Sequence, residues 1–311
     1  MKALVAHTYG PVEDLVFTDV PKPVPGPGQI LVRTEAVAIN AADTVLITGV
    51  MKEVFPLEHP FVPGIDISGV VEEVGEGVTR FAEGDTVLAW LGLPSGAMAE
   101  YVLIDEAPSV AKRPAGLDAI EGAALPTGGL TAFAAVEAAE LGPDRTVLIV
   151  GAAGGVGSFA VQFAKQTGAR VLASGWGEDA DYLKRLGADE TIDYRSVDVP
   201  EETLRLVPGG VDAVIDLAHA GPDLTESVAA TKSGGRVVFV LGSPPESLDR
   251  GVTAVYAGAG APEGRLDDLA AQAAKGRLHV QVSADYPFSR APEAIAAFSR
   301  HHLRGKSTVT F

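Results

Sequence analysis

A glycine-rich turn between a buried strand and an amphipathic helix constrains this chain more than any other segment. Residues Val147–Val150 form a continuous apolar run, as expected of a parallel strand that is buried on both faces. The turn Gly151-Ala152-Ala153-Gly154-Gly155-Val156-Gly157 follows directly. An apolar helical face comes next, and Gly168 is expected just past the end of this helix; the face is formed by Val156, Phe159, Ala160, Phe163 and Ala164. This order predicts the first unit of a doubly wound parallel sheet.

The turn also predicts a phosphate site. Glycine adopts backbone angles that are closed to other residues, and its lack of a Cβ lets a pyrophosphate approach the chain. The amides and the positive dipole end of the following helix face such an anion. The strand–turn–helix context favours a dinucleotide site over a plain glycine-rich turn. We therefore predict cofactor contacts at Gly151, Ala153, Gly154, Gly155, Val156 and Gly157.

The end of the second strand of this unit indicates which nicotinamide cofactor binds. A site selective for NAD usually has an acidic residue about 20 positions after the turn. The predicted strand Arg170–Ser174 ends instead in a serine, whose hydroxyl tolerates the 2′-phosphate of NADPH. We predict NADPH as cofactor, with Ser174 in contact with it. No basic residue follows directly, since Glu178 and Asp179 come next, so further contacts are expected from Tyr194, Arg195, Lys184 or Arg185.

Strands and helices alternate from about Ala123 onward. Further strands are predicted at Glu190–Asp193, Ala213–Leu217 and Arg236–Leu241. Because ligands bind at the carboxyl ends of such strands, cofactor contacts are predicted where these strands end. The residues are Tyr194, Ala218, His219 and Leu241. For His219 the alternative is a histidine that binds nothing.

The remaining segments predict a second unit. Short strands punctuated by proline and glycine suggest a partly closed barrel; they are expected at Lys2–His7, Leu15–Thr18, Ile30–Ile39, Ser68–Val74, Thr86–Leu91 and Glu100–Ile104. After Val255 we expect a helix at Arg265–Lys275, a strand at Leu278–Val282, a helix at Ala291–His301 and a strand at Ser307–Phe311.

Composition excludes several classes of protein. A net charge of −17 disfavours binding to nucleic acid. No uncharged apolar run approaches the ~18 residues of a membrane span, and the apolar start of the chain is too short for a signal peptide, so we expect a cytoplasmic protein. The absence of cysteine excludes disulfides, thiolate catalysis and cysteine-ligated zinc.

Further motifs resemble the medium-chain dehydrogenase/reductases. The segments 64–75 (GIDISGVVEEVG) and 84–87 (GDTV) are similar to signatures of that superfamily. The segment 124–132 (ALPTGGLTA) resembles the entry to the cofactor domain in its zinc-independent, zeta-crystallin-like quinone oxidoreductase branch. With the glycine turn, Leu186–Asp189 and Arg304–Lys306, the resemblance covers nearly the whole chain.

The resemblance implies an α/β fold of two domains. A GroES-like, partly closed β-barrel catalytic domain would comprise residues 1–122 and 256–311, and a Rossmann cofactor domain with a doubly wound parallel sheet would comprise 123–255. The active site is expected in the cleft, and such proteins are commonly homodimers or homotetramers.

The chain departs from the zinc-dependent members of this superfamily. Asn40 stands where those have a cysteine ligand, and Ile65-Asp66 replaces their His-Glu pair. Only a short loop lies between Gly84 and Ala99, where their four-cysteine zinc lobe would be. We therefore predict no metal site. The zinc-free branches reduce quinones, enones or enoyl thioesters, which are electrophilic enough to accept a hydride without a Lewis acid.

Several residues are candidates for the active site. Asn40 and Asp43 either line the cleft, where Asn40 would bind the substrate carbonyl or the nicotinamide ribose, or cap a short helix near Ala41, the role favoured for Asp43. Thr127 approaches the nicotinamide or only starts a helix. Trp90, expected in a loop after a strand, flanks the substrate or packs in the core. Lys306 reaches the cleft, whereas Asp66 is expected to bond within its own loop. Val45-Leu46-Ile47 replaces a tyrosine of many relatives, which predicts a more apolar pocket.

Together these observations predict NADPH-dependent reduction of a quinone or α,β-unsaturated carbonyl by direct hydride transfer without metal. The partner would be a small apolar carbonyl or quinone substrate. The alternatives are an enoyl-thioester reductase, a tailoring reductase of secondary metabolism and, in a different class, a non-catalytic NADPH-binding protein.

Overall fold

The computed structural model describes residues 1–94, 96–244 and 248–311, and these form two compact units. Unit 1 comprises Met1–Thr127 and Ala261–Phe311, and unit 2 comprises Gly128–Gly260. The predicted domain borders after residues 122 and 255 lie a few residues before those of the units. The predicted fold class, a β-barrel domain and a domain built on a parallel sheet, is confirmed.

Unit 1 is built on a seven-stranded sheet in the order β14-β15-β3-β4-β5-β7, with β6 also paired to β3. Its strands are β3 (Gln29–Ile39), β4 (Asp66–Val74), β5 (Thr86–Trp90), β6 (Tyr101–Asp105), β7 (Val110–Lys112), β14 (Val282–Pro287) and β15 (Lys306–Thr310). The pairs are antiparallel except β14–β15. A separate antiparallel pair consists of β1 (Lys2–Val5) and β2 (Val16–Asp19). The long strand β3 thus brings the C-terminal strand β15 beside the N-terminal sheet.

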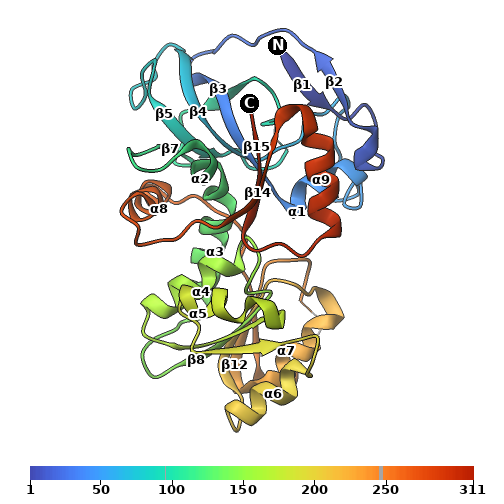
Figure 1. The fold of residues 1–311 in the computed structure, drawn as a ribbon, viewed down its shortest axis with the longest axis vertical. Helices are drawn as coiled ribbons and strands as arrows, with labels where there is room; N and C mark the ends of the chain where they lie inside the picture. Colours follow the sequence, from blue (N-terminus) through green and yellow to red (C-terminus); the bar gives the residue numbers. More distant parts are fainter. Residues whose placement is uncertain (95, 245–247) are drawn as a thin grey trace. The chain divides into compact units, whose positions relative to one another are not determined.

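Four helices pack on unit 1: α1 (Ala41–Thr48), α2 (Ala119–Ala124), α8 (Arg265–Ala274) and α9 (Ala291–Arg300). Figure 1 shows α9 running alongside β14 and β15. Most apolar residues of the central strands are buried, in consecutive runs in β3 and β5; among them are Ile30, Ile39, Ile67 and Leu88. The core is therefore closed by the sheet and by the apolar face of α9, which contributes Ile295.

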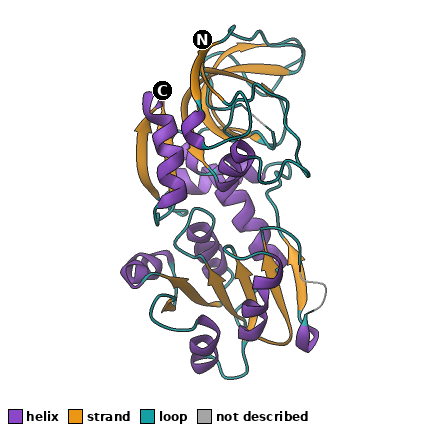
Figure 2. Cartoon of the chain, turned by 90° about the vertical axis from the view of Figure 1, so that its right-hand side faces the viewer, coloured by secondary structure: helices purple, strands orange, loops and turns teal. Residues whose placement is uncertain are grey.

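Unit 2 is a six-stranded parallel sheet in the order β10-β9-β8-β11-β12-β13. The strands are β8 (Thr146–Val150), β9 (Arg170–Gly175), β10 (Glu190–Asp193), β11 (Val211–Asp216), β12 (Thr231–Phe239) and β13 (Thr253–Tyr256). The helices are α3 (Pro126–Ala138), which starts in unit 1, α4 (Gly157–Gln166), α5 (Ala180–Leu186), α6 (Val199–Leu206) and α7 (Leu224–Ala230). Figure 2 shows helices on both faces of this sheet. Gly168 follows α4 with φ +85°, as predicted for a helix end.

Two sheet-edge segments differ from the predictions. The strand predicted at Leu278–Val282 is wrong, because β14 only begins at Val282. Leu278 and Val280 are buried by packing outside a strand, whereas β14 itself alternates between half-buried and exposed residues. The edge strand β13 was not predicted either. Edge strands bury little side-chain area, so the apolar pattern on which strand prediction relies is weak there.

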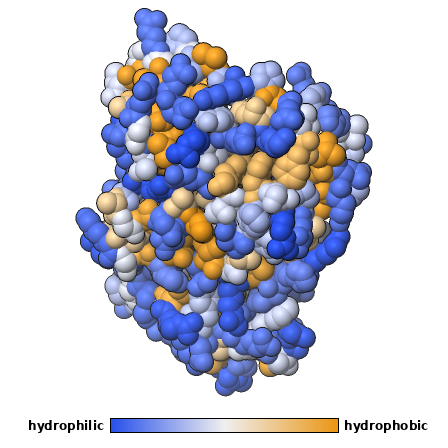
Figure 3. All heavy atoms as spheres, turned by 45° about the horizontal axis from the view of Figure 1, so that its top comes forward, coloured by the Kyte–Doolittle hydropathy of each residue, from blue (hydrophilic) through white to orange (hydrophobic). Residues whose placement is uncertain are grey.

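Figure 3 shows the hydropathy of one face of the molecule. Hydrophilic residues cover much of this face, with apolar patches between them. Among the described helices, none is both long and apolar enough to cross a membrane.

Candidate functional site

The glycine turn of unit 2 has the geometry of a close strand-to-helix connection. Gly151 follows β8 with φ +74°, a conformation that favours glycine. A Cβ on Gly157 would lie 2.2 Å from the carbonyl oxygen of Gly151, so the first residue of α4 has no space for a side chain. A Cβ on Gly154 would meet nothing nearer than 3.5 Å. The fold therefore requires glycine at 157, whereas the glycine at 154 leaves room for a ligand.

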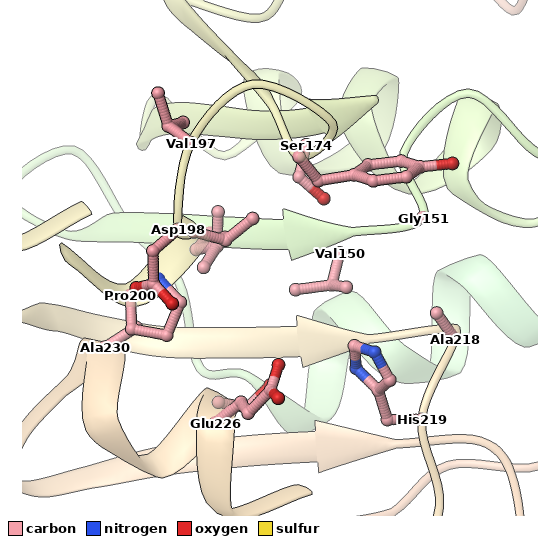
Figure 4. Close-up of a pocket in the computed structure, with 14 residues that line it drawn as sticks. Val150, Gly151, Ser174, Val197, Asp198, Pro200, Ala218, His219, Glu226 and Ala230 are labelled. Atoms are coloured by element: carbon pink, nitrogen blue, oxygen red, sulfur yellow. The ribbon is translucent and has the colours of Figure 1, made fainter. Parts of the chain in front are cut away.

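A cavity of about 440 Å³ lies at the carboxyl ends of β8, β9 and β11 (Figure 4). Of the predicted cofactor residues it is lined by Gly151, Ser174, Tyr194, Ala218 and His219. Its apolar wall includes Leu148, Val150, Val199 and Ala230. Its size and its position at the strand ends are those of a cofactor pocket in an open parallel sheet.

The wall of this cavity contains a buried hydroxyl group, that of Ser174. The residue is only 1% exposed, and its Oγ has no hydrogen-bond partner among the described residues. A buried hydroxyl without a partner destabilises the folded state by about 1–3 kcal/mol. A ligand hydroxyl or phosphate oxygen in the cavity would satisfy it, so the residues present fit a bound dinucleotide.

His219 is held by a buried carboxylate. Asp216, the last residue of β11, is fully buried, and its Oδ2 lies 3.0 Å from Nδ1 of His219. Asp216 also accepts hydrogen bonds from Ser227 Oγ at 2.5 Å and from the backbone N–H groups of Ala218 and His219. This arrangement favours the tautomer with the proton on Nδ1, which leaves Nε2 as an acceptor. Figure 4 shows the imidazole near the strand ends, beside Ala218.

Tyr194 lines the cavity, yet it is exposed. It follows β10, and its hydroxyl accepts a hydrogen bond from Nε1 of Trp176. Leu241 is 41% exposed after β12 and is not among the residues that line the cavity. Ala153 is buried in the turn.

Unit 1 contains a buried polar cluster formed by Asn40, Asp66, Thr127 and Lys306. Asp66 is fully buried, and its Oδ1 accepts hydrogen bonds from Thr127 N at 3.0 Å and Thr127 Oγ1 at 2.7 Å. Its Oδ2 accepts from Asn40 Nδ2 at 3.0 Å and lies 3.4 Å from Lys306 Nζ. The prediction that Asp66 bonds within its own loop is therefore wrong. It is the first residue of β4, and it joins the start of α3 to β3 and β15.

The amide of Asn40 is largely used inside the protein. Its Nδ2 donates to Asp66 and also to the carbonyl of Ala38 at 3.3 Å, and its Oδ1 accepts from Lys306 Nζ at 2.5 Å. Both amide hydrogens are thus engaged, whereas Oδ1 retains a second lone pair. The side chain can accept a hydrogen bond from a ligand but has no hydrogen left for a substrate carbonyl.

Asp43 occupies the capping position. It is fully buried; Oδ2 accepts from the backbone N–H of Asn40 at 2.7 Å, and Oδ1 accepts from Gly64 N at 2.9 Å. Burial raises the pKa of Asp43 to about 7. The carboxyl group therefore fixes the first turn of α1 to the turn at Gly64, and both of its oxygens are used within the protein.

Trp90 and Lys306 both lie in strands. Trp90 is the half-buried last residue of β5, opposite Asp66 of β4, as the predicted strand Thr86–Leu91 implies; its assignment to a loop after that strand is wrong. Lys306 is the first residue of β15, and its side chain is only 5% exposed. The antiparallel pairing of β15 with β3 brings the end of the chain to the Asn40 region.

The sequence matches families of known architecture. Residues 26–115 match the alcohol dehydrogenase GroES-like domain, and residues 155–257 match the family described as zinc-binding dehydrogenase. The chain is 32% identical over 332 residues to the chloroplastic quinone-oxidoreductase QR1 of Triphysaria versicolor, covering 99% of this chain and 98% of that protein. The chain belongs to the medium-chain dehydrogenase/reductase superfamily, in its quinone oxidoreductase-like branch.

Other members of the superfamily differ in cofactor. The chain is 30% identical over 322 residues to the chloroplastic NADPH-dependent alkenal/one oxidoreductase of Arabidopsis thaliana, covering 99% of this chain and 79% of that protein. It also superposes with a TM-score of 0.90, at 32% identity and 100% coverage of both chains, on a crystal structure of an NAD-dependent alcohol dehydrogenase. This medium-chain dehydrogenase/reductase is therefore an oxidoreductase of the nicotinamide-dependent type.

The side chains at the positions of the zinc ligands differ in this chain from those of zinc-dependent members. The chain has no cysteine, and the described residues contain no group of three or more histidines and carboxylates placed to hold a metal ion. Asn40 stands where zinc-dependent members have a cysteine ligand, and Ile65-Asp66 replaces their His-Glu pair. Asn40 and Asp66 are both in contact with the Lys306 side chain. The residues present therefore do not fit a catalytic zinc ion.

The residues that orient His219 and Tyr194 were not predicted. Asp216 orients His219, and Trp176 binds Tyr194. Asp216 could have been found from the sequence, because it is an acidic residue at the end of the strand that precedes His219. For Trp176 there was only its nearness to Ser174 in the sequence.

Proposed function

We propose that this enzyme reduces a quinone or an α,β-unsaturated carbonyl compound with NADPH. The observation that carries the proposal is the unpartnered Ser174 hydroxyl in the wall of the cavity beside the glycine turn. A carboxylate at this position would hold the free ribose hydroxyls of NADH and repel a 2′-phosphate, whereas a hydroxyl can donate to the phosphate. The name of the Arabidopsis relative, an NADPH-dependent alkenal/one oxidoreductase, supports the same assignment.

Unit 2 provides the groups for the adenosine and pyrophosphate parts of the cofactor. The turn from Gly151 to Gly157 and the first turn of α4 would bind the pyrophosphate through backbone N–H groups and the helix dipole. Ser174 and Tyr194 are assigned to the adenosine ribose and its phosphate. The Nε2 lone pair of His219, set by Asp216, would accept a hydrogen bond from a ribose hydroxyl. When bound, NADPH supplies the hydride.

Unit 1 provides the groups assigned to the reacting end. Thr127 Oγ1 and Asn40 Oδ1 each keep an acceptor position, and Lys306 has three N–H groups of which two are directed at Asn40 and Asp66. The remaining donor of Lys306 would stabilise negative charge on a bound group. Trp90 is assigned to the substrate pocket. The network fixes these side chains before binding, which reduces the reorganisation needed for hydride transfer.

We propose that this hydride transfer uses no metal. Quinones and enones accept a hydride at carbon without a Lewis acid, because the charge that develops is delocalised onto oxygen. Asn40 replaces a cysteine ligand of zinc-dependent relatives, and Ile65 replaces the histidine of their His-Glu pair, so neither side chain offers the soft or imidazole ligand that zinc takes. The amide of Asn40 also accepts a hydrogen bond from the ammonium group of Lys306.

A turnover assay tests the function. Purified protein would be mixed with NADPH and a panel of quinones, enals, enones and enoyl thioesters, and the loss of absorbance of the reduced nicotinamide would be followed. We expect turnover of quinones, enals or enones. Turnover confined to thioesters would favour an enoyl reductase, and tight NADPH binding without any turnover would favour a non-catalytic protein.

The resemblance also leads us to propose a homodimer or homotetramer located in the cytoplasm, whose substrate is a small apolar carbonyl or quinone. Light scattering of the purified protein would test the oligomeric state, and fractionation of the source cells would test the location.

A further inference from the structure

The loop that usually selects between the two nicotinamide cofactors has no cation here. It follows β9 and contains Gly175, Trp176 and Gly177, and then Glu178 and Asp179. Asp179 is fully buried, and its Oδ2 accepts a hydrogen bond from the backbone N–H of Trp176 at 2.9 Å. A 2′-phosphate bound at Ser174 would therefore find acidic rather than basic residues along this loop.

A cation reaches this loop from the next strand. The guanidinium of Arg195, two residues after β10, lies over the indole of Trp176 at 4.6 Å from the ring centroid. Tyr194 accepts a hydrogen bond from Trp176 Nε1, so two consecutive residues after β10 hold the same indole. Tyr194 lines the first cavity, and Trp176 and Arg195 line a second one of about 410 Å³. The Trp176–Tyr194 contact thus joins the walls of both cavities.

Arg195 differs from Lys165 and Arg170, which are ion-paired. Lys165 is paired with Asp189 at 2.6 Å, and Arg170 is paired with Glu190 at 2.6 Å. The other basic candidates, Lys184 and Arg185, lie in the last turn of α5, which leads away from the carboxyl end of β9 to the start of β10. Within the described residues no carboxylate lies at ion-pair distance from the Arg195 guanidinium, whose contact is the indole face. Its donors are therefore available to an anion, and a guanidinium can bind two phosphate oxygens at once.

Asp193 fixes the backbone that carries Arg195. Its Oδ1 accepts from Arg195 N at 3.0 Å, and its Oδ2 accepts from Ser196 Oγ at 2.6 Å. These hydrogen bonds, that from Ser196 first, hold the pKa of Asp193 below its usual range. Asp193 and Glu178 line the second cavity together with Arg195. Their charges oppose an incoming phosphate, and among the described residues that line this cavity Arg195 is the one cation that could offset them.

We propose that Arg195, held over Trp176, is the residue that recognises the 2′-phosphate of NADPH. This inference rests on the proposed function and adds the determinant of its cofactor preference. Selectivity would then come from the loop after the third strand of the sheet, with the indole of Trp176 as the support that positions the guanidinium.

The test compares the dissociation constants of NADPH, NADH and 2′-AMP for wild type, Arg195→Gln and Arg195→Lys by calorimetry. Arg205→Gln is the matched control, since Arg205 is an exposed arginine of the same unit that pairs with Glu202. We expect Arg195→Gln to weaken NADPH and 2′-AMP by about 10- to 100-fold, the loss of a charged hydrogen bond. Its affinity for NADH should stay within about twofold, because NADH lacks the phosphate. Arg195→Lys should be intermediate, and Arg205→Gln should match wild type.

Other outcomes separate this inference from the function it rests on. Arg195 does not recognise the 2′-phosphate if Arg195→Gln binds NADPH as tightly as wild type does, or if the substitution lowers the affinities for NADPH and NADH by the same factor. Either result would leave the proposed function intact. If folded wild type binds neither reduced cofactor, the proposed function fails and this inference fails with it. A second readout is the ratio of the NADH to the NADPH dissociation constant at increasing salt concentration. Added salt should lower this ratio for wild type but not for Arg195→Gln, because salt screens the contact between the guanidinium and the phosphate.

Discussion

The Nζ of Lys306 donates a hydrogen bond to Oδ1 of Asn40 at 2.5 Å, which links the first residue of β15 to the residue that precedes α1. Asn40 stands where zinc-dependent relatives have a cysteine ligand. At the position of that cysteine this chain therefore has an amide that is bound to an ammonium group. This contact, together with the buried Asp66 carboxylate, determines how the cluster responds to substitution.

Removing the ammonium should destabilise the protein strongly. Lys306→Met leaves the Asp66 carboxylate buried without its cation, so the free energy of unfolding should fall by about 3 kcal/mol or more in urea titrations. Lys165→Met, which breaks the exposed pair with Asp189, should cost less than about 1 kcal/mol. Adding Asp66→Asn to Lys306→Met should recover part of the loss. Additive losses in the double variant would show that the two groups do not interact.

The glycines of the turn should separate folding from binding. Gly157→Ala places a Cβ 2.2 Å from the Gly151 carbonyl and should lower the melting temperature. Gly154→Ala has space within the protein and should keep the wild-type melting temperature, yet weaken NADPH about tenfold or more by obstructing the pyrophosphate. Gly154→Val should abolish binding with both units still folded. Gly142→Ala, in open space, is the control. Wild-type NADPH affinity in Gly154→Val would mean that the phosphate site is misassigned.

The buried carboxyl group of Asp43 should make stability depend on pH. Its pKa is raised to about 7, so the folded protein holds this proton at pH values where the unfolded chain, with a pKa near 4, has released it. The stability that it contributes is full below about pH 4 and is lost as the pH rises toward 7, by up to about 1.4 kcal/mol per pH unit.

Comparison with Asp43→Asn isolates this effect, because the other carboxylates are common to both proteins. The free energy of unfolding of wild type minus that of the variant should be larger at pH 5 than at pH 8. A difference that is constant, or that grows with pH, would place the pKa of Asp43 in its ordinary range.

A carboxylate at the end of β9 should reverse the cofactor preference. In Ser174→Asp the new charge faces the adenosine ribose, so NADPH should weaken by about tenfold or more relative to NADH. Retained NADH affinity serves as evidence that the pocket is still folded. The account is wrong at this position if both cofactors weaken equally in a protein with an unchanged melting temperature.

Activity should be independent of divalent metal. Prolonged dialysis against a chelator should leave the turnover number unchanged, since the chain offers no thiolate and Asn40 and Asp66 are engaged by Lys306. Loss of activity that added zinc restores would contradict the proposed mechanism.

The sequence predicted the parts of the fold that depend on local pattern. The buried strand before Gly151, the helix after it and the end of that helix at Gly168 follow from apolar periodicity and glycine placement, and they are present. The strand β14 was misplaced because, as an edge strand, it buries few residues and lacks a clear pattern.

The buried polar contacts were much harder to predict. Asp66 contacts Asn40 and Lys306, which are far from it in the sequence. Strand pairing brings such partners together, and the residues next to Asp66 in the sequence do not indicate them. The contact between Arg195 and Trp176 could not be predicted for the same reason, because it depends on β10 pairing with β9. Residue type indicated which side chains carry chemistry, but only the tertiary structure indicates which of their hydrogen-bonding groups are still free.

Binding of NADPH at the glycine turn and the cavity beside Ser174 is tested by calorimetric titration of the purified, folded protein. We expect saturable binding of one NADPH per chain, with NADH binding more weakly. A well-folded protein that takes up neither reduced cofactor would contradict this expectation, because the glycine turn and the cavity beside Ser174 would then have another role.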